Sequence, residues 1–453
     1  MSRETTIIRN AVMVNEGETF KGSLIVCGDT IEKVLRQDSN NAEESHLDAV
    51  HYDHEIDACG AYLLPGVIDE HVHFRDPGLT HKADVSSESR AAAAGGVTSV
   101  MDMPNTKPQT TTIEAWEEKM QHYGEDCLVN YSCYFGATND NHALLPSLNS
   151  RRVCGVKLFM GSSTGNMLVD KAESLRQIFS STDMLIVTHC EDQSIISSNI
   201  SKYPAVDGDL PLSMHPLIRS EEACLRSSET AVGLAQQYGS RLHIAHITTA
   251  RELELLQDTP LTTEKKITGE VCIAHLMFCD KDYERLGTLI KCNPAVKTEA
   301  DRRALRAAIS TNRLDTIATD HAPHVLSEKQ GGALKAASGM PMVQFSLPCM
   351  MQLAAEGSIS VADIVQKMCH NPALLYRIDK RGFLREGYKA DLTLVRHSPW
   401  TLTEDMIESK CKWSPLTGQK FDWQVERTIV NGHTVYANGS IDDSRRGEEL
   451  LFG

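Results

Sequence analysis

The chain has 453 residues, of which 41% are hydrophobic, and it carries a formal net charge of −16. An acidic chain is not expected to bind nucleic acid or an anionic membrane surface, although it can still contain a local basic pocket for a small anion. The length suits a barrel of roughly 250–350 residues with a smaller unit attached.

The N-terminus has no apolar segment of the kind found in a signal peptide, and no run of 18 or more apolar residues predicts a membrane span. The 13 cysteines are scattered along the chain and form no Cys-x-x-Cys pair. This pattern favours reduced thiols and a cytoplasmic location over a disulfide framework.

Both ends of the chain have the pattern of short β-strands separated by turns. Residues 1–58 predict strands over Thr6–Val14, Ser23–Val26 and Thr30–Leu35, followed by a polar connection, Asp38–Asp57. Residues 376–453 return to the same pattern, with a hairpin predicted around the turn Asn431-Gly432. We expect the two ends to pair into one small β-sandwich domain.

Residues 59–375 alternate short apolar runs with helix-like stretches, which predicts an α/β fold of the (β/α)8 barrel type. Helices are predicted over Ser86–Ala94, Ile113–His122, Ser220–Gln237 and Asp301–Ser310. The eight apolar runs are Leu63–Ile68, Val97–Met103, Val129–Phe135, Val153–Phe159, Met184–Val187, Leu242–Ala245, Ile267–Val271 and Thr316–Ala318.

The first apolar run leads into the segment Asp69-Glu70-His71-Val72-His73-Phe74-Arg75. Alternate residues of a strand share a face, so His71, His73 and Arg75 are expected to point the same way as Asp69. Two imidazoles side by side supply two ligands for a divalent metal. A lone His-x-His is as easily explained by a half-exposed strand, so the remaining ligands must come from elsewhere.

Polar residues that can bind metals or anions follow several of the other runs. Because the strands of such a barrel present their carboxyl ends to one face, these residues are expected to meet there. They are Asn105 after the second run, Lys157 within the fourth, His189 after the fifth, His246 after the sixth, and Asp320 and His324 after the eighth.

Two motifs, Asp69-x-His71-x-His73-x-Arg75 and Ala318-Thr319-Asp320-x-Ala322-Pro323-His324, resemble those of the cyclic amidohydrolases, and within them the dihydroorotases. The resemblance implies a metallo-hydrolase barrel with two Zn²⁺ ions per subunit. It implies that His71, His73 and Asp320 bind the more buried ion and that Asp320 is also the catalytic proton shuttle. His189 and His246 would bind the second ion, with His243 a packed strand histidine.

The resemblance also implies that Lys157 is carbamylated, because a carbamate bridges two metal ions where an ammonium would repel them. Some dihydroorotases bridge with an aspartate instead, while allantoinases and hydantoinases use a lysine. Asp170 lies too far along the chain to be preferred as that bridge. A lysine held in a salt bridge at the strand end stays open as the alternative.

The resemblance implies a substrate pocket in which Arg75, Asn105 and His324 bind a carboxylate. Asn293 and the backbone near Gly339, Met340 and Pro341 would hold a ring amide. Ser327–Ser338 is predicted to be a mobile loop near the mouth of the pocket. The alternative for Arg75 is a surface salt bridge with Asp76 or Asp84.

The implied reaction is the reversible hydrolysis of dihydroorotate to N-carbamoyl-aspartate in pyrimidine synthesis. The alternatives are an allantoinase or a dihydropyrimidinase or hydantoinase of the same fold, and a silent homologue that acts as a scaffold for a partner such as aspartate transcarbamoylase. Arg75 favours a dihydroorotase over an allantoinase, because allantoin has no carboxylate for the guanidinium to bind. We expect a homo-oligomer, either a dimer or a tetramer, that acts on a small molecule.

Overall fold

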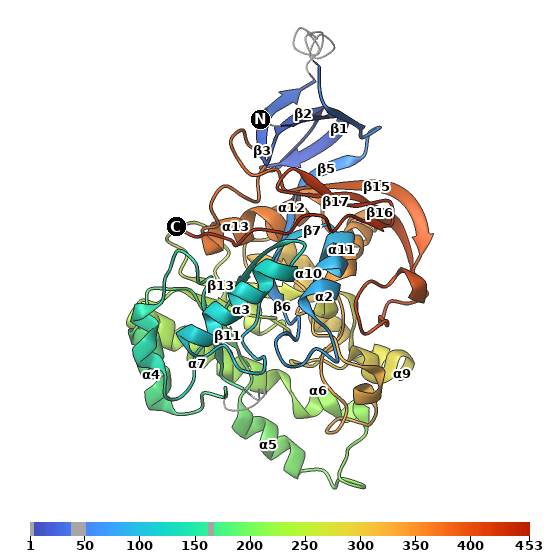
Figure 1. Ribbon diagram of the computed structural model, residues 1–453. Helices are drawn as coiled ribbons and strands as arrows, with labels where there is room; N and C mark the ends of the chain where they lie inside the picture. The colour runs from blue at the N-terminus through green and yellow to red at the C-terminus, as the bar shows by residue number, and fades with distance from the viewer. Residues whose placement is uncertain (1–3, 38–50, 162–166) are drawn as a thin grey trace.

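The computed structural model describes residues 4–37, 51–161 and 167–453, and it has two parts: a large terminal sheet and an α/β barrel (Figure 1). Strands from both ends of the chain, blue and red in the figure, lie next to each other above the helical part. This arrangement confirms the fold predicted from the sequence, a (β/α)8 barrel with a β-rich domain made by both termini.

The terminal sheet has nine strands, in the order β18-β17-β16-β15-β5-β1-β2-β3, with β4 paired to β1. Its core is formed by apolar side chains such as Ile8, Leu24 and Leu394, which are fully buried. The strands are β1 (Thr5–Asn15), β2 (Glu18–Cys27), β3 (Thr30–Arg36), β4 (His54–Asp57), β5 (Tyr62–Pro65), β15 (Leu392–Thr401), β16 (Lys420–Val430), β17 (His433–Ala437) and β18 (Ser440–Ile441).

Two parts of this sheet differ in detail from the sequence pattern. The predicted polar connection over residues 38–57 ends in a strand, because β4 pairs in parallel with β1; residues 38–50 lie outside the described residues. β5 lies beyond residue 58, yet it pairs with β1 on one side and β15 on the other. The strand that joins the chain's two ends is therefore the one that leads directly into the barrel.

The predicted hairpin near the C-terminus is present between β16 and β17. Its two turn residues, Asn431 and Gly432, have φ angles of 50° and 76°, as a tight hairpin turn requires. A Cβ at position 432 would lie 1.9 Å from the carbonyl oxygen of Gly28. The glycine therefore allows the hairpin to pack directly on the β2–β3 turn.

The barrel strands are all parallel and follow one another in sequence order, β6-β7-β8 and then β9 to β14. β8 and β9 are separated by a single residue, Tyr134, so they count as one interrupted strand of an eight-stranded barrel; a parallel bridge between Val72 and His321 closes the ring. The strands are β6 (Val67–Val72), β7 (Val97–Asp102), β8 (Asn130–Cys133), β9 (Phe135–Gly136), β10 (Val156–Phe159), β11 (Ile186–His189), β12 (Leu242–Ile244), β13 (Ile267–Cys272) and β14 (Thr316–Ala318).

The helices begin and end where the sequence places caps. Asp84 caps α2 through the backbone N–H of Ser87, and Gly95 ends it; Thr298 and Asp301 form a capping box on α10. No helix in the described part of the chain has the length and apolar character needed to cross a membrane. The helices are α2 (Val85–Ala94), α3 (Ile113–Asp126), α4 (Ala172–Ser180), α5 (Gln193–Ser201), α6 (His215–Ile218), α7 (Glu221–Tyr238), α8 (Ile273–Met277), α9 (Tyr283–Leu286), α10 (Glu299–Ile309), α11 (Ser346–Ala355), α12 (Val361–Val365) and α13 (Asn371–Tyr376).

One buried carboxylate, Asp391, connects the terminal sheet to the barrel. It accepts hydrogen bonds from the Nδ2 amide of Asn130 on β8, at 3.2 Å, and from the backbone N–H of Asn431, at 2.9 Å. It also pairs with the guanidinium of Arg381, whose side chain is only 5% exposed. The two parts of the chain are thus joined by a largely buried charged network, which an ion pair of 2.8 Å between Arg381 and Glu448 extends to the surface.

We predict that Asp391→Ala lowers the free energy of unfolding by about 3–5 kcal/mol, because it removes the buried partner of the Arg381 guanidinium and leaves only the partly exposed Glu448 to pair with it. Urea unfolding followed by circular dichroism measures this change. The control is Asp443→Ala, which removes an ion pair with Arg90 on the surface and should change the stability by no more than about 1 kcal/mol. Equal effects of the two substitutions would contradict the importance of the buried network.

Candidate active site

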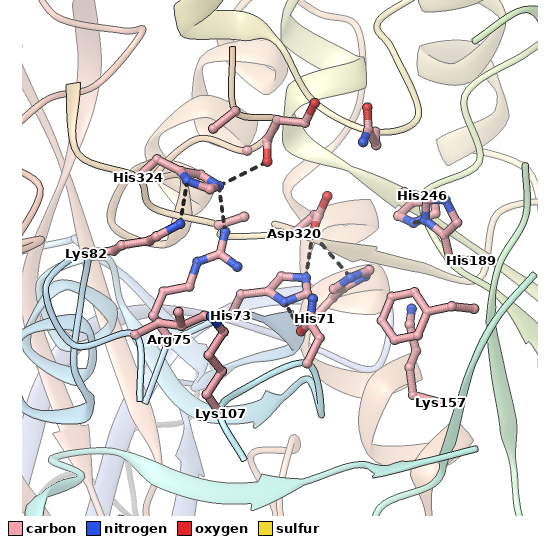
Figure 2. A pocket seen from close by; sticks show the side chains of 18 residues that line it. His71, His73, Arg75, Lys82, Lys107, Lys157, His189, His246, Asp320 and His324 are labelled. Carbon is pink, nitrogen blue, oxygen red and sulfur yellow. Dashed lines mark hydrogen bonds and ion pairs between the residues drawn. The ribbon is translucent and has the colours of Figure 1, made fainter. Parts of the chain in front are cut away.

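The residues singled out in the sequence gather at the carboxyl ends of the barrel strands, which is where such barrels carry their chemistry (Figure 2). They are carried by six strands or by the turns that follow them. His71 lies in β6 and His73 just after it, Asn105 follows β7, Lys157 lies in β10, His189 ends β11, His246 follows β12, and Asp320 and His324 follow β14.

The first cluster consists of His71, His73 and Asp320. The Oδ1 atom of Asp320 lies 3.3 Å from Nε2 of His71 and 3.1 Å from Nε2 of His73 (Figure 2). Asp320 has a φ of 47°, a left-handed conformation that a residue other than glycine adopts only where its surroundings hold it. Three possible metal ligands thus converge within 4.8 Å of one another.

The outer nitrogens of both imidazoles are held by oxygen acceptors. Nδ1 of His71 lies 2.8 Å from Oε1 of Glu270, and Nδ1 of His73 lies 2.8 Å from Oδ1 of Asn105. Because these oxygens accept hydrogen bonds, the ring hydrogen belongs on Nδ1 and the Nε2 lone pair faces Asp320. An outer acceptor of this kind is typical of histidines that bind a metal.

The second cluster is the pair His189 and His246. Nδ1 of His189 lies 2.9 Å from Nε2 of His246, and the two rings are nearly perpendicular. Nε2 of His189 lies 3.1 Å from Oε2 of Glu191, which also pairs with Arg219. The Glu191 carboxylate accepts a hydrogen bond from the Nε2–H group of His189, so the Nδ1 lone pair of His189 faces the ring of His246.

Lys157 lies on β10 between these clusters and is completely buried. Its Nζ atom has no hydrogen-bond partner among the described residues, and it lies 5.3 Å from the centre of the Phe159 ring. Burial lowers the pKa of this amine, although the carboxylates of Glu270 and Asp320 oppose the shift. Figure 2 shows the amine pointing toward the histidines, so the site contains a buried nitrogen without a partner.

The pKa shifts of the site residues favour protonation states that can bind a cation. Burial lowers the pKa of His73 to about 4 and lowers the pKa values of His189 and His246 below the usual range. Burial also opposes ionisation of Asp320, but the nearby imidazoles of His71 and His73 lower the pKa of its carboxyl below the ordinary value. Neutral imidazoles around an ionised carboxylate are the donor set that a divalent metal prefers.

Arg75 lies next to the first cluster, on the side away from Lys157 (Figure 2). Its Nε donates to the carbonyl oxygen of Pro323 at 3.0 Å, and its Nη2 lies 3.0 Å from Nε2 of His324. Nδ1 of His324 lies 2.7 Å from Oε2 of Glu328. Arg75 is only 8% exposed and forms no ion pair within the described part of the chain, so its charge is free for an anion.

These residues surround a cavity of about 420 Å³, a size suited to a small molecule. The amide oxygen of Asn293 is buried at this cavity and has no partner among the residues described. Gly339 lines the cavity and has a φ of 135°; Met340 and Pro341 follow it in the chain but do not contribute to the wall. The lining residues are His71, His73, Arg75, Leu79, Lys82, Asn105, Lys107, Lys157, Phe159, His189, His246, Asn293, Asp320, Ala322, His324, Ala337, Ser338 and Gly339.

The segment Ser327–Ser338 forms part of the wall beside His324. The buried ammonium of Lys329 donates hydrogen bonds to the carbonyl oxygens of Lys291, Ala337 and Gly339, at 2.8–3.1 Å. The motion predicted for this loop stays a prediction, and any opening would first have to break these three hydrogen bonds.

Two residues that the sequence placed outside the site also lie outside it in the structure. Asp170 is exposed and accepts a hydrogen bond from Asn139. His243 packs inside the barrel, where Nδ1 lies 2.8 Å from Oγ1 of Thr268. Neither side chain lines the cavity.

Several polar residues that shape the site had not been predicted from the sequence. Glu270 holds the outer side of His71, Arg219 pairs with the Glu191 carboxylate that holds His189, and Lys82 and Lys107 add positive charge to the cavity wall. A carboxylate inside the apolar run Ile267–Val271 was a visible signal for Glu270. Arg219, Lys82 and Lys107 lie in loops or at a helix end, where single polar residues are common and give no signal of a site.

Parallel strands that converge on a cluster of histidines, a carboxylate and a buried lysine define a barrel hydrolase whose residues can hold metal ions. The chain belongs to the Amidohydrolase family, whose model matches residues 62–435.

Curated relatives cover most of the chain. A dihydroorotase from Halobacterium salinarum is 33% identical over 393 residues, which is 85% of this chain and 89% of that protein. A dihydroorotase from Pyrococcus furiosus is 30% identical over 434 residues, which is 95% of each chain.

Solved structures share the whole fold. L-hydantoinase (dihydropyrimidinase) from Arthrobacter aurescens has a TM-score of 0.89 at 25% identity and covers 98% of both chains. Dihydropyrimidinase from Brevibacillus agri has a TM-score of 0.85 at 20% identity and covers 96% of both chains. At 20% identity, the similarity to the Brevibacillus agri enzyme shows only that the fold is shared.

Two buried histidines beside Asn293 predict how stability depends on pH. Nε2 of His215 lies 2.9 Å from the carbonyl oxygen of Cys292, and Nε2 of His275 lies 3.0 Å from that of Pro294. Burial lowers the pKa of His215 to about 3 and that of His275 to about 4. Between these values and about 6.5 the unfolded chain binds protons that the folded chain does not, so stability should fall as the pH falls.

We predict a slope of up to about 1.4 kcal/mol per pH unit for each such histidine in urea unfolding of the metal-free protein between pH 4 and 6.5. His215→Gln keeps a donor for the Cys292 carbonyl and should flatten the slope by up to one proton. His81→Gln is the control, since its side chain is 59% exposed. If His215→Gln left the dependence of the free energy of unfolding on pH unchanged, His215 would not contribute to that dependence.

Proposed function

We propose that this protein is a zinc-dependent dihydroorotase, which reversibly hydrolyses (S)-dihydroorotate to N-carbamoyl-L-aspartate in de novo pyrimidine biosynthesis. The observation that carries the proposal is the buried guanidinium of Arg75, which has no ion-pair partner among the described residues and shares a small cavity with the histidine clusters. Dihydroorotate has a ring amide to hydrolyse and a carboxylate for Arg75. The dihydroorotases from Halobacterium salinarum and Pyrococcus furiosus support the same activity.

In this proposal the clusters would hold two Zn²⁺ ions per subunit. His71, His73 and Asp320 would hold the more buried ion, His189 and His246 would hold the other, and Lys157 in its carbamylated form would be a ligand of both. The converging lone pairs and the unpartnered Nζ of Lys157 support this assignment. When bound, the ions would supply an activated water and polarise the scissile carbonyl.

The side chains of the protein then position the substrate and move the proton. Water adds to the ring carbonyl carbon, and the bond from that carbon to the ring nitrogen breaks. Asp320 takes a proton from the water and returns it to the leaving nitrogen. Arg75 and His324 bind the carboxylate, and Asn105 joins them through its amide Nδ2, since its oxygen is engaged by His73.

The ring amide would be held by Asn293 and by the backbone near Gly339. The unpartnered amide oxygen of Asn293 suits a ring N–H donor. Met340 and Pro341 would support this segment from behind, since the backbone N–H of Ala322 donates to the carbonyl of Met340 at 3.0 Å.

The second candidate is another cyclic amidase, since the similar solved structures are hydantoinases and dihydropyrimidinases. An allantoinase is disfavoured by Arg75, because allantoin offers no carboxylate to a buried guanidinium. A silent scaffold is disfavoured because every predicted metal ligand is present and lies at the cavity.

Location and assembly belong to the same proposal. All 13 cysteines are free of disulfides, which supports a reducing compartment such as the cytoplasm. The predicted dimer or tetramer and an association with aspartate transcarbamoylase stay predictions that size-exclusion chromatography with light scattering would test.

The first test concerns specificity. Arg75→Gln should lower kcat/KM for dihydroorotate about 30- to 1000-fold, because a charge-assisted contact worth roughly 2–4 kcal/mol is lost. Arg75→Lys should retain only part of the kcat/KM for dihydroorotate, since an ammonium cannot reproduce the planar fork of the guanidinium. Hydrolysis of dihydrouracil and bound zinc, measured on the same samples, should change little.

If both substrates lost activity equally, Arg75 would act on the metal centre or the fold, and the choice of dihydroorotase over its relatives would lose its basis. Purified parent protein assayed side by side with dihydroorotate, allantoin and hydantoin tests the same choice. Faster turnover of a ring without a carboxylate would overturn the proposal.

The second test concerns Lys157. Lys157→Ala should lose bound zinc and lower kcat at least about 100-fold, because the loss of a bridging carboxylate removes several kcal/mol of stabilisation by the metal centre. Propionate should restore part of the activity in the space left by Lys157→Ala. Lys157→Met is the matched control, since its side chain fills that space and blocks the added acid. Unchanged zinc and rate in both variants would mean that Lys157 is only structural.

A further inference from the structure

Glu270 is a completely buried carboxylate in β13, behind the wall of the cavity. Its Oε1 atom lies 2.8 Å from Nδ1 of His71 and accepts a hydrogen bond from the backbone N–H of His246 at 2.9 Å. One oxygen atom therefore contacts one histidine from each of the two clusters.

Glu270 also holds the turn that carries His246. Its backbone carbonyl accepts a hydrogen bond from the N–H of Ile247 at 2.7 Å, so two successive N–H groups of this turn bind the same residue. His246 has a φ of 42°, a left-handed conformation that disfavours a residue with a side chain. The double contact explains how this strained residue is kept in place.

The surroundings of Glu270 are unfavourable for a carboxylate that has only a packing role. Within the described residues no lysine or arginine lies within ion-pair distance of it, and its Oε2 atom has no hydrogen-bond partner. Glu70 lies close by and is also buried, with neither of its carboxyl oxygens bonded. Burying a carboxylate costs free energy that its partners must offset, so packing alone does not explain a glutamate at this position.

We propose that Glu270 is a positioning residue that fixes the hydrogen of His71 on Nδ1 and holds the backbone turn from which His246 reaches the site, so that both clusters bind metal together. It touches neither the cavity nor the substrate, and it acts only through the two histidines. The inference rests on the proposed function in that the clusters hold Zn²⁺, and it adds a single residue that couples the two metal positions.

The experiment measures Zn²⁺ binding to metal-free parent and variants by competition with a chromophoric chelator. Glu270→Ala should weaken Zn²⁺ binding by about 10- to 100-fold, the range expected when a histidine loses its outer acceptor. Glu270→Gln keeps an acceptor oxygen of the same shape and should weaken binding less. Co²⁺ is the second probe, and its visible absorption should change in both variants, since it reports ligand geometry directly.

Glu252 provides a matched control. It is also a buried glutamate, and it accepts hydrogen bonds from Ser228, Thr248 and Thr249, while no histidine among the described residues forms a hydrogen bond with it. Glu252→Ala should lower Tm while leaving Zn²⁺ affinity within about threefold of the parent. This control separates loss of metal binding from general loss of stability, which circular dichroism and thermal unfolding record for each variant.

Folded Glu270→Ala that binds Zn²⁺ with the affinity and Co²⁺ spectrum of the parent would overturn the inference, whatever its activity. A parent that binds Zn²⁺ but fails to hydrolyse dihydroorotate would contradict the proposed function while the Glu270 result still stood. A similar loss of Zn²⁺ affinity in Glu252→Ala and Glu270→Ala would also overturn it, because the effect would then be one of stability.

Discussion

The structure depends on one electrostatic constraint, the concentration of buried nitrogen groups around Asp320, the one carboxylate among the described residues that line the cavity. Imidazoles from β6, β11 and β12 converge there with the amine of Lys157, all with little exposure. Lone pairs that face one another in a dry interior repel unless a cation lies between them, and outer acceptors that fix the ring hydrogens keep these lone pairs turned inward. The surrounding layer supplies those acceptors through Glu270, Asn105 and Glu191.

The same constraint explains where the backbone is strained. Arg75, His246 and Asp320 all have positive φ angles, between 42° and 67°, and all three line the cavity. Such conformations persist when neighbouring groups over-determine them, and they cluster at sites that must hold side chains in one orientation. Hydrogen bonds from Arg75 to the Pro323 carbonyl and from His246 to Glu270 are examples of that support.

The cavity is divided between two kinds of chemistry. On one side neutral imidazoles, a carboxylate and a buried amine suit metal ions. On the other side Arg75, His324 and Lys82 form a basic wall, in which Glu328 balances Lys82 at 2.9 Å and leaves Arg75 uncompensated. A chain with an acidic surface thus contains a local positive pocket, which a small anion would enter against the overall charge.

Much of this was determined by the sequence alone. Hydrophobic runs separated by capped helices specify a parallel barrel, because each strand needs a crossover of that length. The alternation of His71 and His73 on a strand specifies that they share a face, and the hairpin at Asn431-Gly432 follows from its turn chemistry. These features are local, so the chain's own order contains them.

Only the tertiary structure decided what depends on distant contacts. Glu270 stands 199 residues from His71, and Arg219 stands 28 residues from Glu191, so no local pattern predicts either pairing. Tertiary contacts also placed β5 in the terminal sheet, since a strand's partners depend on which edges the fold leaves open. Likewise, the role of each lysine at or near the cavity depends on what it faces. Lys82 binds Glu328 and Lys329 binds three carbonyls, whereas Lys157 finds no partner in the described structure.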